Sequence, residues 1–174
     1  STNIIMGDFN GDLSTDLLIV DTTGATNAML YLSTGTGLDA GHAIPSSTGW
    51  HNYQIVEGDW NGDGKADIAL ISAVSGTPHV ILLSTGTGFS QAATIADTDG
   101  PDAGVAADWN NDVASDLWIK SASDTLYTPL FGSSSFAPER IISVDNGMGA
   151  VTNVSYDRLN KNGVRIRIVG ERDG

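Results

Sequence analysis

Residues 58–70 read GDWNGDGKADIAL, and this stretch decides the fold because related stretches occur three times along the chain. It returns as GDFNGDLSTDLLI at residues 7–19 and as ADWNNDVASDLWI at residues 107–119, so the copies are 51 and 49 residues apart. Self-similarity at a period of about 20 to 50 residues is the signature of a repeat architecture. The sequence therefore predicts three repeated units.

A second motif keeps the same phase as the first. It reads LSTGTGL at residues 32–38, LSTGTGF at 83–89 and LFGSSSF at 130–136. Short apolar runs lie between the motifs, and no segment shows a sustained helical period, so each unit is expected to form four short strands. Four strands per repeat of about 50 residues is typical of a β-propeller blade. The chain is predicted to be all-β, with blades at about residues 1–50, 51–100 and 101–139.

The blades and the C-terminal tail differ in charge. Residues 1–139 contain 2 basic and 17 acidic side chains, whereas residues 140–174 contain 6 basic and 4 acidic ones. The pairs Asn146-Gly147 and Asn162-Gly163 are strong hairpin signals. The tail is predicted to be a β-hairpin segment that caps the blades or begins the next domain. Because closed propellers need about 4 to 8 blades, the chain is expected to be part of a larger propeller in a longer parent chain, or to self-associate.

The overall charge restricts the partners. In 174 residues the chain has 8 Lys and Arg against 21 Asp and Glu, which gives a formal charge of -13. Phosphate backbones and anionic lipids would be repelled, so nucleic acid is not an expected partner. No apolar run approaches the length of a membrane helix, so membrane insertion is not expected either. The absence of cysteine excludes disulfides and thiolate metal sites.

The repeated acidic motif places side-chain oxygens at positions 1, 3, 5 and 9 of a loop. Three carboxylates in nine residues repel one another, and a hard divalent cation that accepts six to eight oxygens relieves the repulsion. Calcium fits better than magnesium, which holds its waters, or zinc, which prefers nitrogen and sulfur. Ordinary turns rich in Asp, Asn and Gly are the alternative. Up to three calcium sites, one per repeat, are predicted from the following residues: Asp8, Asn10, Asp12 and Asp16; Asp59, Asn61, Asp63 and Asp67; Asp108, Asn110, Asp112 and Asp116.

Two further loop positions distinguish the repeats. Position 6 is Gly64 in the second loop but Leu13 and Val113 in the others, and a positive φ there would strain a side chain with a Cβ. The second site is therefore predicted to bind calcium most tightly. Position 2 is aromatic in all three loops, as Phe9, Trp60 and Trp109, which predicts rings buried between blades rather than exposed platforms for sugars.

The motif Asp8-Phe9-Asn10-Gly11-Asp12-x-x-x-Asp16 and its two copies resemble the FG-GAP or VCBS repeats of integrin α-like calcium-binding β-propellers. The resemblance covers about residues 1–140. It implies a propeller, usually of seven blades, with calcium in the loops, on extracellular or secreted proteins. Leu13 in the first loop and Asn111 and Val113 in the third depart from the family pattern. The resemblance therefore does not imply full calcium occupancy of the first and third sites.

A second resemblance is to the VCBS segments of bacterial Rhs-type and Tc-toxin B-component proteins. It rests on the LSTGTG turns and on residues 141–156, which are similar to the stretch that leads into the toxin-enclosing shell. This resemblance implies a secreted bacterial toxin-shell protein in which the propeller segment is a docking or gate module.

No catalytic arrangement is found in the sequence. His42, His51 and His79 form no metal-binding or nucleophile-activating pattern, and structural roles are expected for them. The leading hypothesis is a non-catalytic calcium-binding propeller segment that serves as a structural and protein-interaction module, with protein or the remaining blades as partner. The alternatives are a carbohydrate-binding lectin on the same repeat, for which the partner is a glycan, and an accessory domain of a secreted polysaccharide-degrading enzyme.

Overall fold

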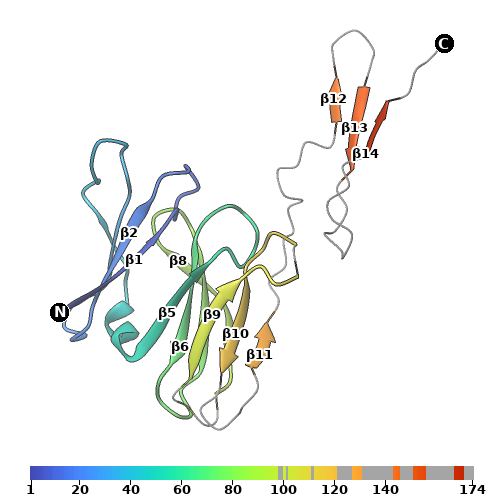
Figure 1. Ribbon diagram of the computed structural model, residues 1–174. Helices are drawn as coiled ribbons and strands as arrows, with labels where there is room; N and C mark the ends of the chain where they lie inside the picture. The colour runs from blue at the N-terminus through green and yellow to red at the C-terminus, as the bar shows by residue number, and fades with distance from the viewer. Residues whose placement is uncertain are drawn as a thin grey trace. The chain divides into compact units, whose positions relative to one another are not determined.

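The structure is a computed structural model whose regular elements are almost all strands (Figure 1). It describes residues 1–97, 100, 102–110 and 112–120, and strand backbone at 127–130, 143–145, 151–155 and 167–170. The chain forms two compact units, Ser1–Phe136 and Ala137–Gly174. The prediction of an all-β chain is confirmed, whereas closure into a ring stays a prediction.

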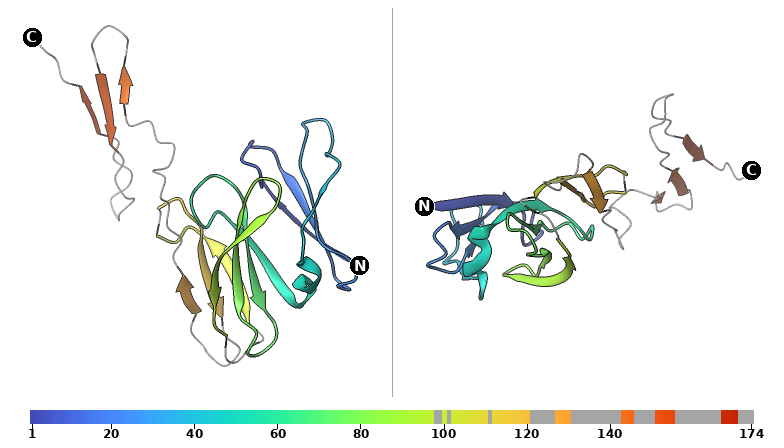
Figure 2. Two further views of the ribbon diagram at one scale, coloured as in Figure 1. Left: turned by 180° about the vertical axis from the view of Figure 1, so that it is seen from behind. Right: turned by 90° about the horizontal axis from the view of Figure 1, so that it is seen from below.

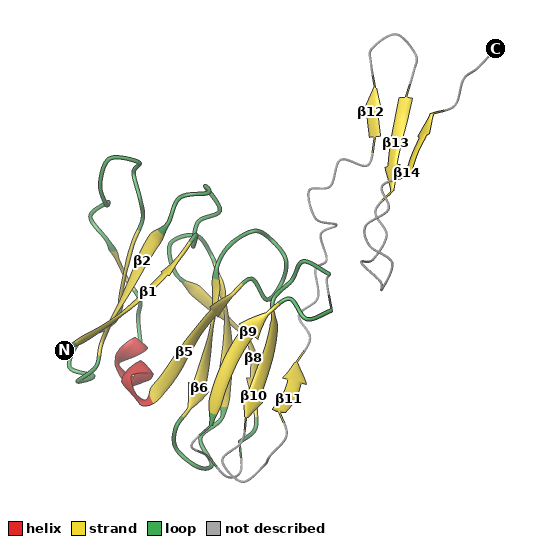
Figure 3. Cartoon of the chain, in the orientation of Figure 1, coloured by secondary structure: helices red, strands yellow, loops and turns green. Residues whose placement is uncertain are grey.

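The first sheet is a four-stranded antiparallel meander. It consists of β1 (Thr2–Gly7), β2 (Asp16–Asp21), β3 (Met29–Tyr31) and β4 (His42–Ala43) in that order. A short 3-10 helix, η1 (Ser47–Asn52), follows it and leads directly into the next sheet (Figure 3).

The second sheet repeats the same meander, and its last two strands are longer than those of the first sheet. It consists of β5 (Tyr53–Gly58), β6 (Asp67–Ser72), β7 (His79–Ser84) and β8 (Phe89–Ile95) in that order. Its register matches the first sheet, because Gly7 pairs with Asp16 and Gly58 pairs with Asp67. The 51-residue spacing is therefore also a structural repeat.

The third sheet has three described strands, β9 (Ala103–Ala107), β10 (Asp116–Lys120) and β11 (Tyr127–Leu130). The predicted fourth strand of this repeat would follow residue 130 and falls outside the described residues. In the second unit, β12 (Ser143–Asp145), β13 (Val151–Ser155) and β14 (Arg167–Gly170) form an antiparallel sheet in that order. The two predicted Asn-Gly turns of the tail lie outside the described residues.

Within residues 1–136 the three sheets stand side by side in chain order, coloured from blue to orange in Figure 2. We call the face of each sheet toward the next sheet its forward face, and the opposite face its back face. The forward face of the first sheet and the back face of the second share one core, which contains Leu18, Val20, Leu30, Ile68, Leu70 and Leu82. The second core contains Val56, Ala69 and Ile71 against Leu117 and Ile119. Full burial of a side chain of this size contributes about 1.5–3 kcal/mol.

Neighbouring sheets are also joined by a repeated backbone contact between their acidic loops. The Ala66 N–H at position 8 of the second loop donates to the Asp8 carbonyl at position 1 of the first, at 2.6 Å. The Ser115 N–H of the third loop donates to the Asp59 carbonyl of the second, also at 2.6 Å. The three acidic loops therefore form a row at one end of the strands of the stacked sheets.

Close approach of the loops depends on the residue that ends the first strand of each sheet. A Cβ on Gly7 would lie 2.6 Å from the Ala66 Cβ, and one on Gly58 would lie 2.9 Å from the Ser115 Cβ. Real Cβ atoms essentially never come so close. Glycine at this position thus lets the next loop reach its hydrogen-bond partner.

Candidate metal centre

The first aspartate of each acidic loop holds the loop in the same conformation. Its two carboxylate oxygens accept the backbone N–H groups of positions 5 and 6, because a short Asp side chain reaches back over the turn that follows it. The distances are 3.1 and 2.7 Å from Asp8, 3.1 and 2.8 Å from Asp59, and 3.1 and 3.0 Å from Asp108. The loops are therefore structural copies, not only sequence copies.

The aspartate at position 9 fastens the loop to its own sheet. Asp16, Asp67 and Asp116 are fully buried at the start of the second strand. Each accepts the N–H of the aromatic residue at position 2, at 2.8–3.0 Å. In the first two sheets the other oxygen accepts the N–H of Ser33 or Ser84, at 2.7 Å. These serines belong to the LSTGTG motif, so the position 9 carboxylate joins the two sequence motifs of a repeat.

Positions 3 and 5 lie closer to solvent and bind each other. The side-chain amide of Asn10, Asn61 or Asn110 donates to Asp12, Asp63 or Asp112, at 3.0–3.2 Å. In the second loop the Lys65 ammonium also contacts the Asp63 carboxylate, at 2.8 Å.

The Lys65 contact affects the charge of a predicted calcium ligand. Partial burial acts to raise the pKa of Asp63, but the hydrogen bonds from Lys65 and Asn61 and the Lys65 charge hold it below its ordinary value. A cation bound at Asp63 would compete with the Lys65 ammonium, a competitor that position 7 of the other two loops lacks because Ser14 and Ala114 stand there.

Position 6 has a left-handed backbone in all three loops, as the sequence predicted for Gly64. The φ angles are 68° at Leu13, 83° at Gly64 and 81° at Val113. Leu13 is 95% exposed, so no packing of its side chain offsets the unfavourable backbone. The first and third loops thus hold a strained residue where the second has glycine.

The FG-GAP-like repeat family matches residues 8–70, a span that contains the first two acidic loops and the strands between them. This chain carries an FG-GAP-like repeat. The predicted resemblance is thereby confirmed. No curated protein matches the sequence.

Several solved structures of a TcdB2-TccC3 complex are similar to this chain. Crystal structures of TcdB2-TccC3, and of TcdB2-TccC3 without its hypervariable C-terminal region, match with a TM-score of 0.57 and 18% identity. The matches cover 88% of this chain but only 7–8% of the TcdB2-TccC3 chain. A TcdB2-TccC3-TEV structure matches over 86% of this chain, with a TM-score of 0.55. At this identity the likeness establishes the fold alone.

The donor set of the FG-GAP-like loops suits a hard cation. The predicted ligands of each loop are three carboxylates and one side-chain amide oxygen, the donors that calcium prefers. Burial, aided by the negative charges of Asp63 and Asp59, raises the pKa of Asp67 to about 6. Repulsion among these carboxylates is a cost that a bound cation would remove. The residues of the second loop therefore fit calcium in chemical type and in charge.

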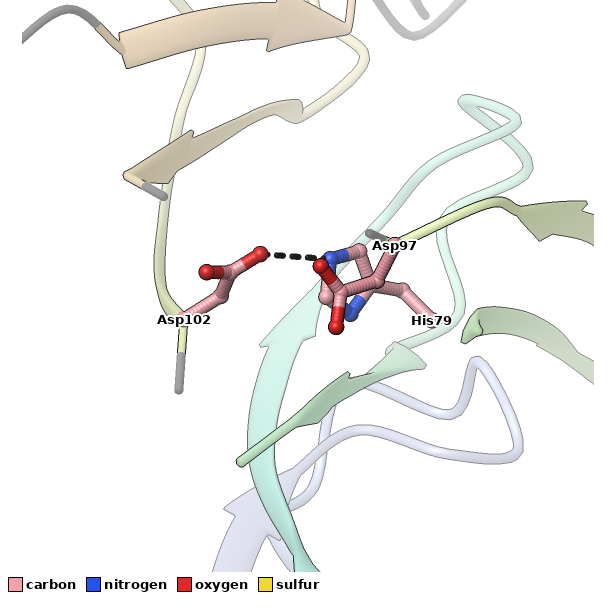
Figure 4. A group of neighbouring side chains, drawn as sticks. All are labelled: His79, Asp97 and Asp102. Carbon is pink, nitrogen blue, oxygen red and sulfur yellow. Dashed lines mark hydrogen bonds and ion pairs between the residues drawn. The ribbon is translucent and has the colours of Figure 1, made fainter. Parts of the chain in front are cut away.

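A different group lies closer together than the carboxylates of any acidic loop. Among the described residues, only His79, Asp97 and Asp102 bring three candidate ligand atoms within 4.8 Å of one another (Figure 4). The His79 Nδ1 accepts the Ser72 N–H at 2.9 Å, and its Nε2 faces the Asp102 carboxylate at 3.1 Å. Since Nδ1 is an acceptor, the proton of the neutral ring is on Nε2 and is donated to Asp102. Neither nitrogen has a lone pair left for a metal.

The His79 group therefore joins the second sheet to the start of the third. The Asp102 N–H also donates to the Ser72 carbonyl, at 3.2 Å, which closes a ring of hydrogen bonds. The other histidines have local partners: the Asp39 carboxylate for His42 and the Thr48 carbonyl for His51, both at 2.7 Å. The sequence predicted structural roles for all three but gave no sign that His79 is buried beside an aspartate 23 residues away.

The aromatic residues at position 2 follow the sequence prediction in two repeats of three. Phe9 and Trp60 are buried between sheets, but Trp109 is 55% exposed and lies against Trp118, with ring centroids 5.3 Å apart. The prediction of burial is wrong for Trp109. Phe9 and Trp60 are each covered by the sheet that follows, whereas no described residue covers Trp109 in this way.

A cavity of about 390 Å³ lies between the segment that connects the first two sheets and the second sheet. Its lining includes the aromatic residues Trp50, Tyr53 and Phe89 together with Gln91. Trp50 and Phe89 pack edge to face, with centroids 6.0 Å apart, and Phe89 packs in the same way against Phe9. These rings largely pack against one another.

Within the described residues, no helix has the length and apolar character needed to span a membrane.

Proposed function

We propose that this chain is a non-catalytic, calcium-stabilised β-propeller segment that serves as a structural and protein-interaction module of a secreted bacterial toxin-shell protein. The observation that carries the calcium part is the shared frame of the three acidic loops, in which the same carboxylates are held by the same backbone groups. Asp8, Asp59 and Asp108 with their position 3, 5 and 9 partners would hold the ions. Bound calcium would neutralise carboxylates that repel one another.

The structural role is supported by the place of the loops. They form a row across the sheet boundaries, so an ion that orders one loop also orders a contact between two sheets. FG-GAP-like repeats are typically structural modules without catalytic activity, which supports the non-catalytic assignment. The likeness to a small part of TcdB2-TccC3 supports membership of a larger assembly.

Thermal unfolding with calcium and with a chelator tests the calcium proposal. A ligand that binds only the folded state stabilises it by about 2.7 kcal/mol per site at a hundredfold excess over Kd. Chelation should therefore lower Tm by several degrees, and a Tm that does not respond to calcium or chelator would contradict the proposal.

Calorimetric titration of loop variants tests the order of the sites. Asp63→Ala should weaken total calcium binding more than Asp112→Ala, because Gly64 gives the second loop an unstrained turn. Lys65→Met should strengthen binding at the second loop, since it removes the ammonium that contacts Asp63. Equal losses for the two Ala variants would refute the order.

A lectin is the second candidate function, favoured by the aromatic residues around the cavity beside the second sheet. It ranks below the structural module because Trp50 and Phe89 pack against each other and Trp50 is buried. A glycan array with the native chain and a Tyr53→Ala variant tests this candidate. Binding that the substitution removes would establish it, and an array without signal would exclude it for the glycans displayed.

A further inference from the structure

The back face of the first sheet carries a continuous apolar surface. Six side chains from three neighbouring strands form it, and we call them the open face: Ile4, Met6, Leu17, Ile19, Met29 and Tyr31. The strand register places Ile4 beside Ile19 and Met6 beside Leu17, and it places Leu17 beside Tyr31 and Ile19 beside Met29. Ile4 is 55% and Met6 65% exposed, and the other four are half-buried. On β2 this face ends at Asp21, which pairs with Thr2, and the six apolar side chains lie between Asp21 and the acidic loop.

The second sheet shows what covers a surface of this kind. The 51-residue repeat places Leu17, Ile19 and Tyr31 at the positions of Ile68, Leu70 and Leu82. Those three side chains are buried against the forward face of the first sheet. The open face therefore has the composition of a surface that packs against a preceding sheet, but the described residues supply none.

A backbone group in the first acidic loop also indicates that a preceding sheet would pack against the open face. The position 8 amides of Ala66 and Ser115 each donate to the first carbonyl of the preceding loop. Thr15 holds position 8 in the first loop, and it is exposed and has no such acceptor among the described residues. Its N–H would be satisfied by a further acidic loop placed as the other two are.

The forward face of the third sheet is poorly suited to cover the open face. This argues against a second copy of this chain as the partner, because the forward faces of its first two sheets already pack against the next sheet. Strand β9 of the third sheet ends at Ala107. The first strands of the other two sheets end at Gly7 and Gly58, which leave room for the loop of the next sheet. Lys120 replaces Val20 and Ile71 on the forward face of the third sheet, which places a charge where the other two sheets bury an aliphatic side chain. A sheet of the first or second type fits the open face better.

We infer that the open face binds one further FG-GAP-like sheet, with aliphatic residues on its forward face, glycine before its acidic loop, and a loop carbonyl that accepts the Thr15 N–H. This inference deepens the proposed function and rests on its repeat architecture. The interaction surface is specific in direction, because it receives a preceding sheet and not a following one.

A tandem protein tests the inference on the full chain. Residues 1–51 are placed ahead of Ser1, which keeps the repeat in phase and offers the open face a copy of the forward face with Leu18, Val20 and Leu30. Because the chain has no cysteine, Ile4→Cys in the original copy introduces a single thiol whose reaction rate with a disulfide reagent reports exposure. Val74→Cys is the matched control, since Val74 is 52% exposed and lies in the second repeat.

The thiol at position 4 should react at least tenfold more slowly in the tandem protein than in the 174-residue chain, whereas the thiol at position 74 should react equally in both. Equal rates at position 4, in a tandem protein whose added sheet shows protected amides in hydrogen exchange, would overturn the inference. A rate that falls as the concentration of the 174-residue chain rises would assign the face to a second copy and overturn it as well. The calcium titrations use the 174-residue chain, so failure of this inference is separable from failure of the calcium proposal.

Discussion

The first and second sheets have the same strand order and register but are covered differently. All six residues of β6 are buried, whereas burial alternates along β2 from residue to residue. The difference lies in the neighbours: among the described residues, the second sheet packs against a sheet on each face, whereas the first sheet packs against a sheet on one face. Strand β2 is apolar on both faces like β6, which agrees with the inference that a further sheet covers the open face.

The largest expected effect tests this difference directly. Leu70→Ala should lower the free energy of unfolding by about 2–5 kcal/mol, because it opens a cavity in a closed core. Ile19→Ala, at the equivalent position of the first sheet, should cost on the order of 1 kcal/mol, because Ile19 is half-exposed. Urea denaturation measures both values. Equal losses would mean that the open face is covered in solution.

A second prediction concerns the approach of the loops to the neighbouring sheet. Gly58→Ala should destabilise the chain by about 1–3 kcal/mol, because the added methyl group would lie 2.9 Å from the Ser115 Cβ. Gly49→Ala is the control, since a Cβ there meets nothing within 4 Å and the φ angle is not positive. Its unfolding free energy in urea should stay within about 0.5 kcal/mol of the native value. A Gly58→Ala chain as stable as the control would show that the sheets separate easily.

The third prediction compares the acidic loops at position 6. Gly64→Ala should destabilise the chain by roughly 1–2 kcal/mol through the backbone alone, because no atom lies within 4 Å of the added Cβ. Val113→Gly should stabilise it by about 0.5–1 kcal/mol, since relief of the left-handed strain exceeds the extra entropy of glycine in the unfolded chain. Chemical denaturation with chelator present isolates the backbone effect from metal binding. Opposite signs would contradict the assignment of strain.

The smallest expected effect lies at the surface of the first sheet, away from the acidic loops. The Thr23 N–H, followed by the Thr23 hydroxyl and the Thr26 groups, lowers the pKa of Asp21. A lowered pKa in the folded state contributes stability above the unfolded pKa of about 3.9 and loses it as the pH falls. Asp21→Asn should therefore destabilise the chain at pH 7 and make its unfolding midpoint less sensitive to acid below about pH 4. If the unfolding midpoints of the two proteins fall in parallel as the pH decreases, Asp21 does not contribute to the loss of stability in acid.

The sequence predicted those features of the fold that are local in the chain. The acidic motif marked the turn between the first two strands of each sheet, and Gly64 marked the left-handed position that the structure has at 83°. Both follow from steric rules that act over a few residues. The strands were predictable for the same reason, since their apolar runs lie between strong turn signals.

Features that depend on the arrangement of sheets were not predictable from the sequence. Trp109 matches Phe9 and Trp60 in position, yet it is exposed because its burial depends on a following sheet rather than on its own loop. The contact of His79 with Asp102 joins two sheets and has no sequence pattern. Position 9 is an intermediate case. The sequence predicted Asp16 to be a calcium ligand, which stays a prediction, and the structure adds that Asp16 accepts the Ser33 N–H within its own sheet.

The backbone bonds between neighbouring loops bear on how freely such repeats can diverge. Thr15, Ala66 and Ser115 hold the same loop position, and Ala66 and Ser115 each donate their main-chain N–H to the preceding loop. The Ser115 hydroxyl also accepts the Asp59 N–H, at 3.0 Å. The bond that the two contacts share is made by the main chain, so residues of different chemistry can form it, and proline at this position would abolish it. Position 8 can therefore differ in polarity from one copy to the next, whereas the glycine that faces Ala66 or Ser115 has no room for a Cβ.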